Sequence, residues 1–175
     1  SILSGIYELL FKPMKQRLNM IKPILHLLAG AAGSGKSYVR ENILNLTCQV
    51  IDADEFKKQH PNYDPKNPSL VHEWSSIQAA RAFNKALAKG ETFVYDGTGT
   101  KTEKYLTMIE AAHTAGFEVS LTYVKVKLET SLKRNAERAR TVPEMLVREQ
   151  HNALRYSIPT LSNSVDKFQI IENDS

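Results

Sequence analysis

The sequence predicts a three-layer α/β/α fold with a mostly parallel central sheet of about five strands. Short apolar runs rich in β-branched residues alternate along the chain with longer segments. In several of the longer segments apolar residues recur every three or four positions, which is the helical period. No repeat or low-complexity tract interrupts this alternation. Strands that alternate with helices form parallel βαβ units, so we expect helices to cover the sheet on both faces.

The strands are expected at 24–29, 49–51, 92–95, 118–126 and 168–171. Helices are expected between them, at 35–46, 68–89, 101–115, 128–138 and 143–156. Gly90 and Gly116 follow two of these helices, where a glycine accepts the left-handed conformation that ends a helix. In such a sheet ligands bind at the carboxyl ends of the strands, so functional residues are expected there.

Length and composition fit one globular domain, with 175 residues of which 42% are hydrophobic and 24% charged. No segment reaches the roughly 18 uninterrupted apolar residues of a membrane helix, so we expect no membrane partner. The single cysteine, Cys48, allows no intrachain disulfide, which fits a cytoplasmic location. The formal charge of +4 favours anionic partners without separating a nucleotide from a polynucleotide.

Residues 1–23 precede the first predicted strand and are interpreted as an N-terminal helical extension to a domain that spans 24–175. An apolar segment opens this extension, and basic residues, Lys12, Lys15, Arg17 and Lys22, follow it. We expect the segment to pack on the core of the domain. The alternative is that its apolar side chains dock a partner.

A glycine-rich motif after the first predicted strand is the strongest functional signal. Residues 30–37 read GAAGSGKS and match G-x-x-x-x-G-K-[ST] between an apolar run and a helical segment. Glycines let backbone N–H groups turn toward phosphate oxygens, and the following helix presents its positive end to them. Lys36 is expected to reach the β- and γ-phosphates, and the Ser37 hydroxyl to bind Mg²⁺. The predicted site for ATP or GTP comprises Gly30, Ala31, Ala32, Gly33, Ser34, Gly35, Lys36, Ser37 and Tyr38.

Two absences narrow the class of P-loop protein. The sequence contains no N-K-x-D motif, which GTPases use to read guanine. It is also too short for a transporter ATPase with its additional helical subdomain. We therefore predict a kinase-type P-loop NTPase.

Acidic residues end two of the predicted strands, where a substrate hydroxyl would lie. Asp52 and Asp54 are two positions apart beside the P-loop, and Asp96 precedes Gly97 and Thr98 at the end of the next strand. One acid could take the proton of the attacking hydroxyl, while another orients water around Mg²⁺ or holds the acceptor. Capping the next helix is the other role for such an aspartate, and for Asp52 both roles stay open.

A basic cluster precedes Pro143. Arg134 and Arg138 are four residues apart on one helix face, and Arg140 lies in the loop beyond. A planar guanidinium can hold two phosphoryl oxygens at once, which suits phosphoryl transfer. We interpret the cluster as a lid over the phosphates; the alternative is a solvated basic face.

Together these segments resemble the zeta-toxin family of P-loop kinases, with the polynucleotide 5′-kinases as related proteins. The resemblance spans 24–143 and rests on GAAGSGKS, VIDADEFKKQHPNYD, FVYDGTGTKT and the arginines before TVP. It implies that Asp54 is the base that deprotonates the acceptor. It also implies that Arg138 and Arg140 are the lid arginines, with Arg134 as the alternative. Acceptor contacts are predicted for Asp52, Lys57, His60, Asp96, Thr98 and Arg134.

Zeta toxins phosphorylate the 3′-hydroxyl of the sugar in UDP-N-acetylglucosamine and related sugar nucleotides, and an antitoxin holds them inactive. The resemblance therefore implies a Mg²⁺-dependent phosphotransferase acting on a UDP-N-acetyl sugar, with an antitoxin as a candidate partner. Trp74 is interpreted as a core residue, with the acceptor pocket as the alternative.

Two other functions stay open. A polynucleotide 5′-hydroxyl kinase acting on RNA or DNA would use the same catalytic parts, and the pI near 9.1 favours it. The other is a nucleotide-binding interaction module without transfer, which would hold a partner through the apolar N-terminal segment.

Overall fold

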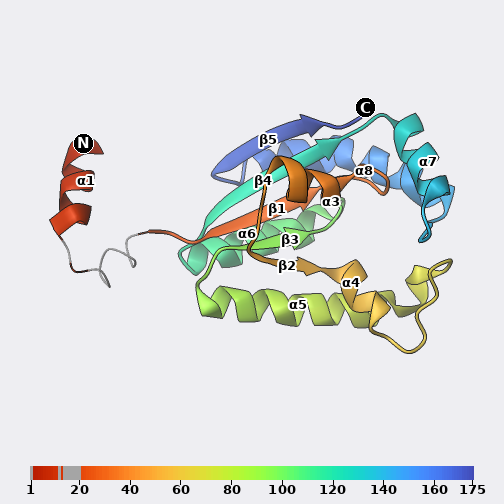
Figure 1. Ribbon diagram of the computed structural model, residues 1–175, viewed down its shortest axis with the longest axis horizontal. Coiled ribbons are helices and arrows are strands. Elements are labelled where there is room, and N and C mark those ends of the chain that lie inside the picture. Colours follow the sequence, from red (N-terminus) through yellow and green to blue (C-terminus); the bar gives the residue numbers. More distant parts are fainter. Residues whose placement is uncertain (1, 12, 14–20) are drawn as a thin grey trace.

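The computed structural model describes residues 2–11, 13 and 21–175 (Figure 1). They include a five-stranded sheet in which every neighbouring pair is parallel, in the order β2-β3-β1-β4-β5. The strands are β1 (Ile24–Ala29), β2 (Gln49–Asp52), β3 (Phe93–Asp96), β4 (Glu118–Lys125) and β5 (Lys167–Glu172). The predicted α/β fold with a parallel sheet of five strands is confirmed.

Helices follow the strands as the alternating pattern predicts. They are α3 (Lys36–Tyr38), α4 (Ala53–Lys58), α5 (His72–Lys89), α6 (Thr102–Thr114), α7 (Leu128–Glu137) and α8 (Glu144–Ser162). Three segments differ from the prediction. Helix α4 lies in a segment where no helix was expected. The helix expected at 35–46 is α-helical only in α3 and continues as a π-helix, η1 (Val39–Ile43), while the helix expected at 68–89 begins with a 3₁₀ turn, η2 (Pro68–Val71).

The strand order decides which helices cover each face. The connection from β1 to β2 crosses the sheet in one direction, and all later connections cross it in the other. Because such connections are right-handed, α3 and η1 lie on one face, and α5, α6 and α8 on the other. The direction reverses between β1 and β3, and ligands of such sheets bind at the carboxyl ends of the strands at this switch point.

Alternate strand residues form the main core with α5, α6 and α8, and these include Leu25, Leu27, Phe93, Tyr95 and Leu121. Tyr105 of α6 is buried with them, and its hydroxyl donates a 2.7 Å hydrogen bond to the Leu28 carbonyl of β1. This bond joins α6 to the central strand one residue before its end. The core therefore holds the carboxyl end of β1 in place directly before the P-loop.

The N-terminal helix α1 (Ile2–Phe11) has no buried residue and lies apart from the sheet in Figure 1. Its apolar side chains are exposed, among them Ile2, Leu3, Tyr7, Leu10 and Phe11. The expectation that this segment packs on the core is wrong for α1. Three of the basic residues predicted for the extension, Lys12, Lys15 and Arg17, lie outside the described residues. Within the described ranges, no helix is both long and apolar enough for a membrane span.

Candidate active site

The P-loop connects β1 to α3 through glycines that need a left-handed backbone. Gly33 and Gly35 have φ of 80° and 83°, which favours glycine. A Cβ at Gly33 would lie 2.6 Å from the backbone oxygen of Ser131 in α7, so the loop also packs closely against the lid helix. The Lys36 ammonium donates a 3.0 Å hydrogen bond to the Gly30 carbonyl. The loop thus has the local geometry of a phosphate cradle.

A cavity of about 830 Å³ opens beside the P-loop at the carboxyl ends of the strands. Most of the predicted site residues line it, although they come from distant segments. They are Ala31 to Ser37 of the P-loop, Asp52 at the end of β2, Asp54 and Lys57 of α4, Asp96 at the end of β3, Thr98 after it, and the predicted lid residues Arg134, Arg138 and Arg140. Tyr38 is exposed and His60 lies elsewhere, so the geometry does not support a direct role in this cavity for either residue.

Asp54 is held between two cations. Its carboxylate pairs with Arg140 Nη1 at 2.8 Å and with Lys57 Nζ at 3.3 Å. Burial alone would raise the pKa of Asp54, but the charges of Arg140 and Lys57 outweigh burial and hold the pKa below its ordinary value. The carboxylate is therefore ionised and able to accept a proton. The Arg140 contact also brings the lid directly onto the residue predicted as the base.

Asp52 caps helix α4, since its Oδ1 accepts a 2.8 Å hydrogen bond from the Asp54 backbone N–H. The structure thus supports the capping role, while Asp52 also lines the cavity. Burial, followed by the nearby charges of Asp96 and Asp54, raises the pKa of Asp52 to about 6. Asp52 and Asp54 therefore differ sharply in acidity although they are two residues apart.

Asp96 ends β3 and is paired with Arg40 of η1, whose Nη1 lies 2.7 Å from Asp96 Oδ2. The sequence analysis did not single out Arg40. The spacing of Arg40 after the P-loop could have placed it near the site, but its pairing with Asp96 depends on the strand order, which puts β3 next to β1. The acceptor contact predicted for Asp96 therefore involves a carboxylate that already carries one strong partner.

Several hydrogen bonds hold α7 and the loop after it, which carry the residues predicted to form a lid. Arg134 donates to the carbonyl of Asn173 at 2.7 Å and lies 3.3 Å from the carbonyl of Ser34, so it anchors α7 to the P-loop. Buried Asn135 donates to the Val142 carbonyl at 2.8 Å and accepts from the Val142 N–H at 3.1 Å. This pair of bonds closes the loop that carries Arg138 and Arg140.

Arg138 ends α7 and lines the cavity, where burial and the charge of Arg140 lower its guanidinium pKa from the ordinary value. Gln150 of α8 was not predicted, yet its Oε1 accepts a 2.9 Å hydrogen bond from the Ala32 N–H of the P-loop. A side-chain amide on a helical face gives no sequence signal, so Gln150 could be found only from the fold.

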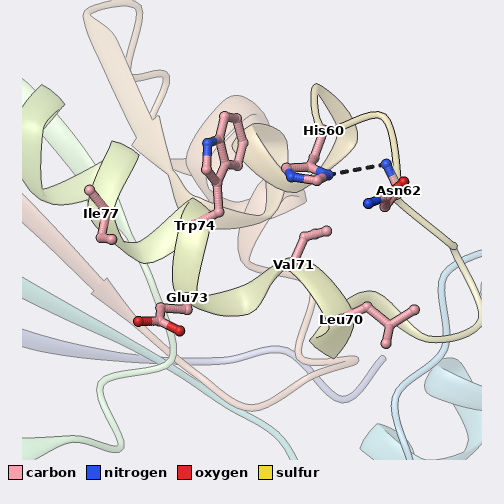
Figure 2. Close-up of a pocket in the computed structure, with 7 residues that line it drawn as sticks. All are labelled: His60, Asn62, Leu70, Val71, Glu73, Trp74 and Ile77. Atoms are coloured by element: carbon pink, nitrogen blue, oxygen red, sulfur yellow. Dashed lines mark hydrogen bonds between the residues drawn. The ribbon is translucent and has the colours of Figure 1, made fainter.

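His60 lines a second cavity of about 600 Å³, formed with the start of α5 (Figure 2). Its Nδ1 accepts a hydrogen bond from the Asn62 N–H at 3.1 Å, and its ring lies edge-on to Trp74 at 5.1 Å. Trp74 is half-buried and borders this cavity, so the prediction that it belongs to the core is wrong. Neither residue lines the cavity at the P-loop.

The residues at the P-loop fit a Mg²⁺ ion bound with a nucleotide. The Ser37 hydroxyl and the carboxylates of Asp52 and Asp96 line the same cavity, and these oxygen donors suit this hard cation. Among the described residues there is no cluster of three His, Cys, Asp or Glu side chains arranged to hold a metal by themselves. Such a site agrees with Mg²⁺ chemistry, because this ion usually keeps waters and takes ligands from substrate phosphates.

The chain is similar to known proteins in sequence and in fold. The "Zeta toxin" family model matches residues 10–175. A "Toxin zeta" of Streptococcus agalactiae is 33% identical over 110 residues, which are 55% of this chain and 38% of that protein. The chain spans less than half the length of the curated relatives it matches.

Solved structures share the fold. A structure of the PezAT chromosomal toxin-antitoxin system of Streptococcus pneumoniae has a TM-score of 0.68 at 20% identity, covering 87% of this chain and 69% of that one. The AvrRxo1-ORF1:-ORF2 structure with ATP has a TM-score of 0.73 at 18% identity, covering 89% and 56%. At these identities the likeness shows the fold, whereas the family model covers nearly the whole sequence. The chain therefore belongs to the zeta-toxin family.

Proposed function

We propose that this chain is a Mg²⁺-dependent phosphotransferase that moves the γ-phosphate of ATP or GTP to a hydroxyl of a UDP-N-acetyl sugar. The observation that carries the proposal is the contact between Asp54 and Arg140, 2.8 Å apart in the cavity that the P-loop lines. This contact supports the proposal because Asp54, Arg140 and the P-loop line one cavity, as a base, a lid arginine and a phosphate cradle would. Family membership supports the choice of acceptor.

In the proposed reaction Lys36 and the lid arginines surround the γ-phosphate, and their charges stabilise the negative charge that spreads over the moving group. The acceptor hydroxyl oxygen forms a bond to the γ-phosphorus as the bond to the β–γ bridging oxygen breaks. The Asp54 carboxylate takes the hydroxyl proton, and the nucleoside diphosphate leaves. The Ser37 hydroxyl would hold Mg²⁺, which when bound would supply charge neutralisation at the phosphates.

Lysines on the acceptor side of the cavity keep a polynucleotide 5′-kinase open as a second function. Lys58, Lys66 and Lys101 are exposed and line the cavity, and such residues could follow a phosphate backbone. If the acceptor is a polynucleotide, its binding to the protein should weaken steeply as the salt concentration rises. A sugar nucleotide predicts a much flatter response, because fewer phosphates are contacted.

The test incubates the protein with Mg²⁺ and γ-labelled ATP in the presence of UDP-N-acetylglucosamine or a 5′-hydroxyl oligonucleotide. We expect label on the sugar nucleotide, and loss of that label in Asp54→Asn with nucleotide binding retained. Glu110→Gln, a change of an exposed acid on α6, is the matched control. If only the oligonucleotide is labelled, the acceptor is a polynucleotide and the proposed sugar nucleotide is wrong. Full transfer by Asp54→Asn would refute the assignment of Asp54 as the base.

Transfer to neither acceptor, with tight ATP binding, would favour the third function, an interaction module that binds nucleotide without transfer. The exposed apolar residues of α1 are the feature that favours such a role. Deleting residues 1–12 should then abolish partner binding.

A further inference from the structure

Arg40 is the charged residue on η1 that reaches the site, and the chemistry proposed above does not use it. It follows the P-loop residues Lys36 and Ser37 by one turn, on the same helical segment. That turn is π-helical, a rare geometry that occurs mostly as single turns and often near functional sites. The wider turn changes the direction in which the following side chains leave the helix.

The side chain of Arg40 forms a buried ion pair with Asp96. Nη1 lies 2.7 Å from Asp96 Oδ2, and the two side chains are only 14% and 5% exposed. The second contact of Arg40, to Glu41 at 3.3 Å, is with a side chain that is 62% exposed. Removing one partner of a buried pair leaves an uncompensated charge, whereas an exposed pair contributes little. Of the two partners of Arg40, Asp96 therefore makes the energetically important contact.

The position of Asp96 connects this pair to the acceptor side of the cavity. Asp96 lies opposite Asp52 of β2 in the sheet register, and both residues line the cavity. The two carboxylates therefore end neighbouring parallel strands, where like charges repel unless a cation compensates one of them. Burial raises the pKa of Asp52, and the charge of Asp96 raises this pKa further.

Only one oxygen of Asp96 is taken by Arg40. The ion pair involves Oδ2, and within the described residues no protein group is hydrogen-bonded to Oδ1. A carboxylate held at one oxygen is fixed in orientation, and its second oxygen can accept a hydrogen bond from a ligand. Arg40 also joins Asp96 to the helical segment that carries Lys36, so the donor and acceptor sides of the cavity share one rigid connection.

We propose that Arg40 is a positioning residue of the phosphotransferase, which holds Asp96 at the end of β3 so that Oδ1 can bind the acceptor. The inference rests on the proposed function, in which Asp96 contacts the acceptor. Arg40 acts through Asp96 and touches neither substrate. Its loss misplaces the acceptor, and a misplacement of about 1 Å can lower turnover by a factor on the order of 100.

The experiment compares Arg40→Met, Arg40→Lys, Asp96→Asn and the double variant Arg40→Met/Asp96→Asn, with Glu41→Gln as the matched control. Kinetic constants are measured with UDP-N-acetylglucosamine as acceptor, and MgATP binding is measured separately. We expect Arg40→Met to lower kcat/KM for the acceptor by about 100-fold and to leave the Kd for MgATP within about threefold. Arg40→Lys should recover part of the loss, and Glu41→Gln should match the wild type.

The double variant tests whether Arg40 acts through Asp96. If it does, Arg40→Met/Asp96→Asn should be no slower than Asp96→Asn alone, because the carboxylate to be positioned is already gone. The double variant should also unfold at a higher temperature than Arg40→Met, which leaves Asp96 buried without its cation. If the loss of kcat/KM in the double variant equals the product of the losses in the two single variants, the inference is overturned.

Two outcomes separate this inference from the proposed function. Transfer by the wild type with unchanged kcat/KM in Arg40→Met would overturn the inference alone. Absence of transfer by the wild type to any acceptor offered would overturn the proposed function and the inference with it. A third outcome would also overturn the inference. If Arg40→Met and Arg40→Lys both lose MgATP affinity and acceptor turnover to the same extent, the role of Arg40 is merely structural.

Discussion

Replacing Arg140 by methionine is expected to raise the pKa of Asp54. Methionine keeps much of the aliphatic side chain but removes the guanidinium, whose Nη1 lies 2.8 Å from Asp54 Oδ2. Burial raises the pKa of Asp54, while Arg140 and then Lys57 lower it, so the loss of Arg140 leaves burial opposed mainly by Lys57.

The geometry gives the reason. An arginine at this distance stabilises the ionised form of an aspartate, so its removal favours the protonated form. The Asp54 side chain is 39% exposed and keeps its second cation, so solvent screening and Lys57 limit the rise in its pKa. The same shift is expected when a nucleotide draws Arg140 toward its γ-phosphate, which would make Asp54 a stronger base only once the donor is bound.

The assay is a carbon-13 NMR titration of the Asp54 carboxyl in the nucleotide-free protein. Arg148→Met is the matched control, because Arg148 pairs with exposed Glu144 on α8 rather than with the site. An unchanged Asp54 titration in Arg140→Met, or an equal shift in Arg148→Met, would refute the reasoning. It would mean that the lid arginine does not set the acidity of the candidate base.

Three further predictions concern residues around the P-loop. Tyr105→Phe should lower the free energy of unfolding by about 1–3 kcal/mol in urea denaturation, since it leaves the Leu28 carbonyl without its hydrogen bond; no loss would mean that another group satisfies the carbonyl. Gly33→Ala should weaken binding of a fluorescent ATP analogue at least about tenfold, equivalent to 1.4 kcal/mol, because φ is 80° and the new Cβ meets the Ser131 backbone oxygen; unchanged affinity would contradict this. Asp52→Asn keeps a good helix cap and removes a carboxyl whose folded-state pKa, about 6, exceeds the unfolded value near 3.8. A raised pKa makes the wild type lose stability as pH rises from about 4 to about 6. The stability of the variant relative to the wild type should therefore increase over that window by about 1–3 kcal/mol. A difference in thermal unfolding that stays constant across this pH range would contradict the prediction.

The parts of the site that were predictable are those with a local sequence signal. The P-loop is a contiguous motif, because its chemistry needs glycines, a lysine and a hydroxyl at fixed spacing on a strand-to-helix turn. Asp52 and Asp96 end neighbouring strands, Asp54 lies in the first turn of the helix after Asp52, and a parallel sheet brings such strand ends to one edge. The resemblance then assigned the base and the lid arginines, and the structure places these side chains around one cavity.

Other contacts at the site could not be predicted, because no motif or spacing in the sequence marks their residues. Arg40 reaches Asp96, 56 residues away, because the helical segment after the P-loop carries it past the end of β1 and β3 lies next to β1. Asn135 and Gln150 hold the lid and the P-loop through single side-chain amides, which are too common in sequences to mark a site. His60 shows the opposite case, since a sequence match placed it at the acceptor while the fold places it in a second cavity.

The sequence by itself determined the fold class, the phosphate cradle and the acidic strand ends, because these depend on periodicity and on spacing within short segments. The tertiary structure decided which charges are paired: Arg140 with Asp54, Arg40 with Asp96, and Arg134 with the backbone of the P-loop and the chain end. Pairing depends on distances between side chains that are far apart in the chain, and electrostatic energy changes steeply over a few ångströms. Only the strand order and the helix geometry set those distances.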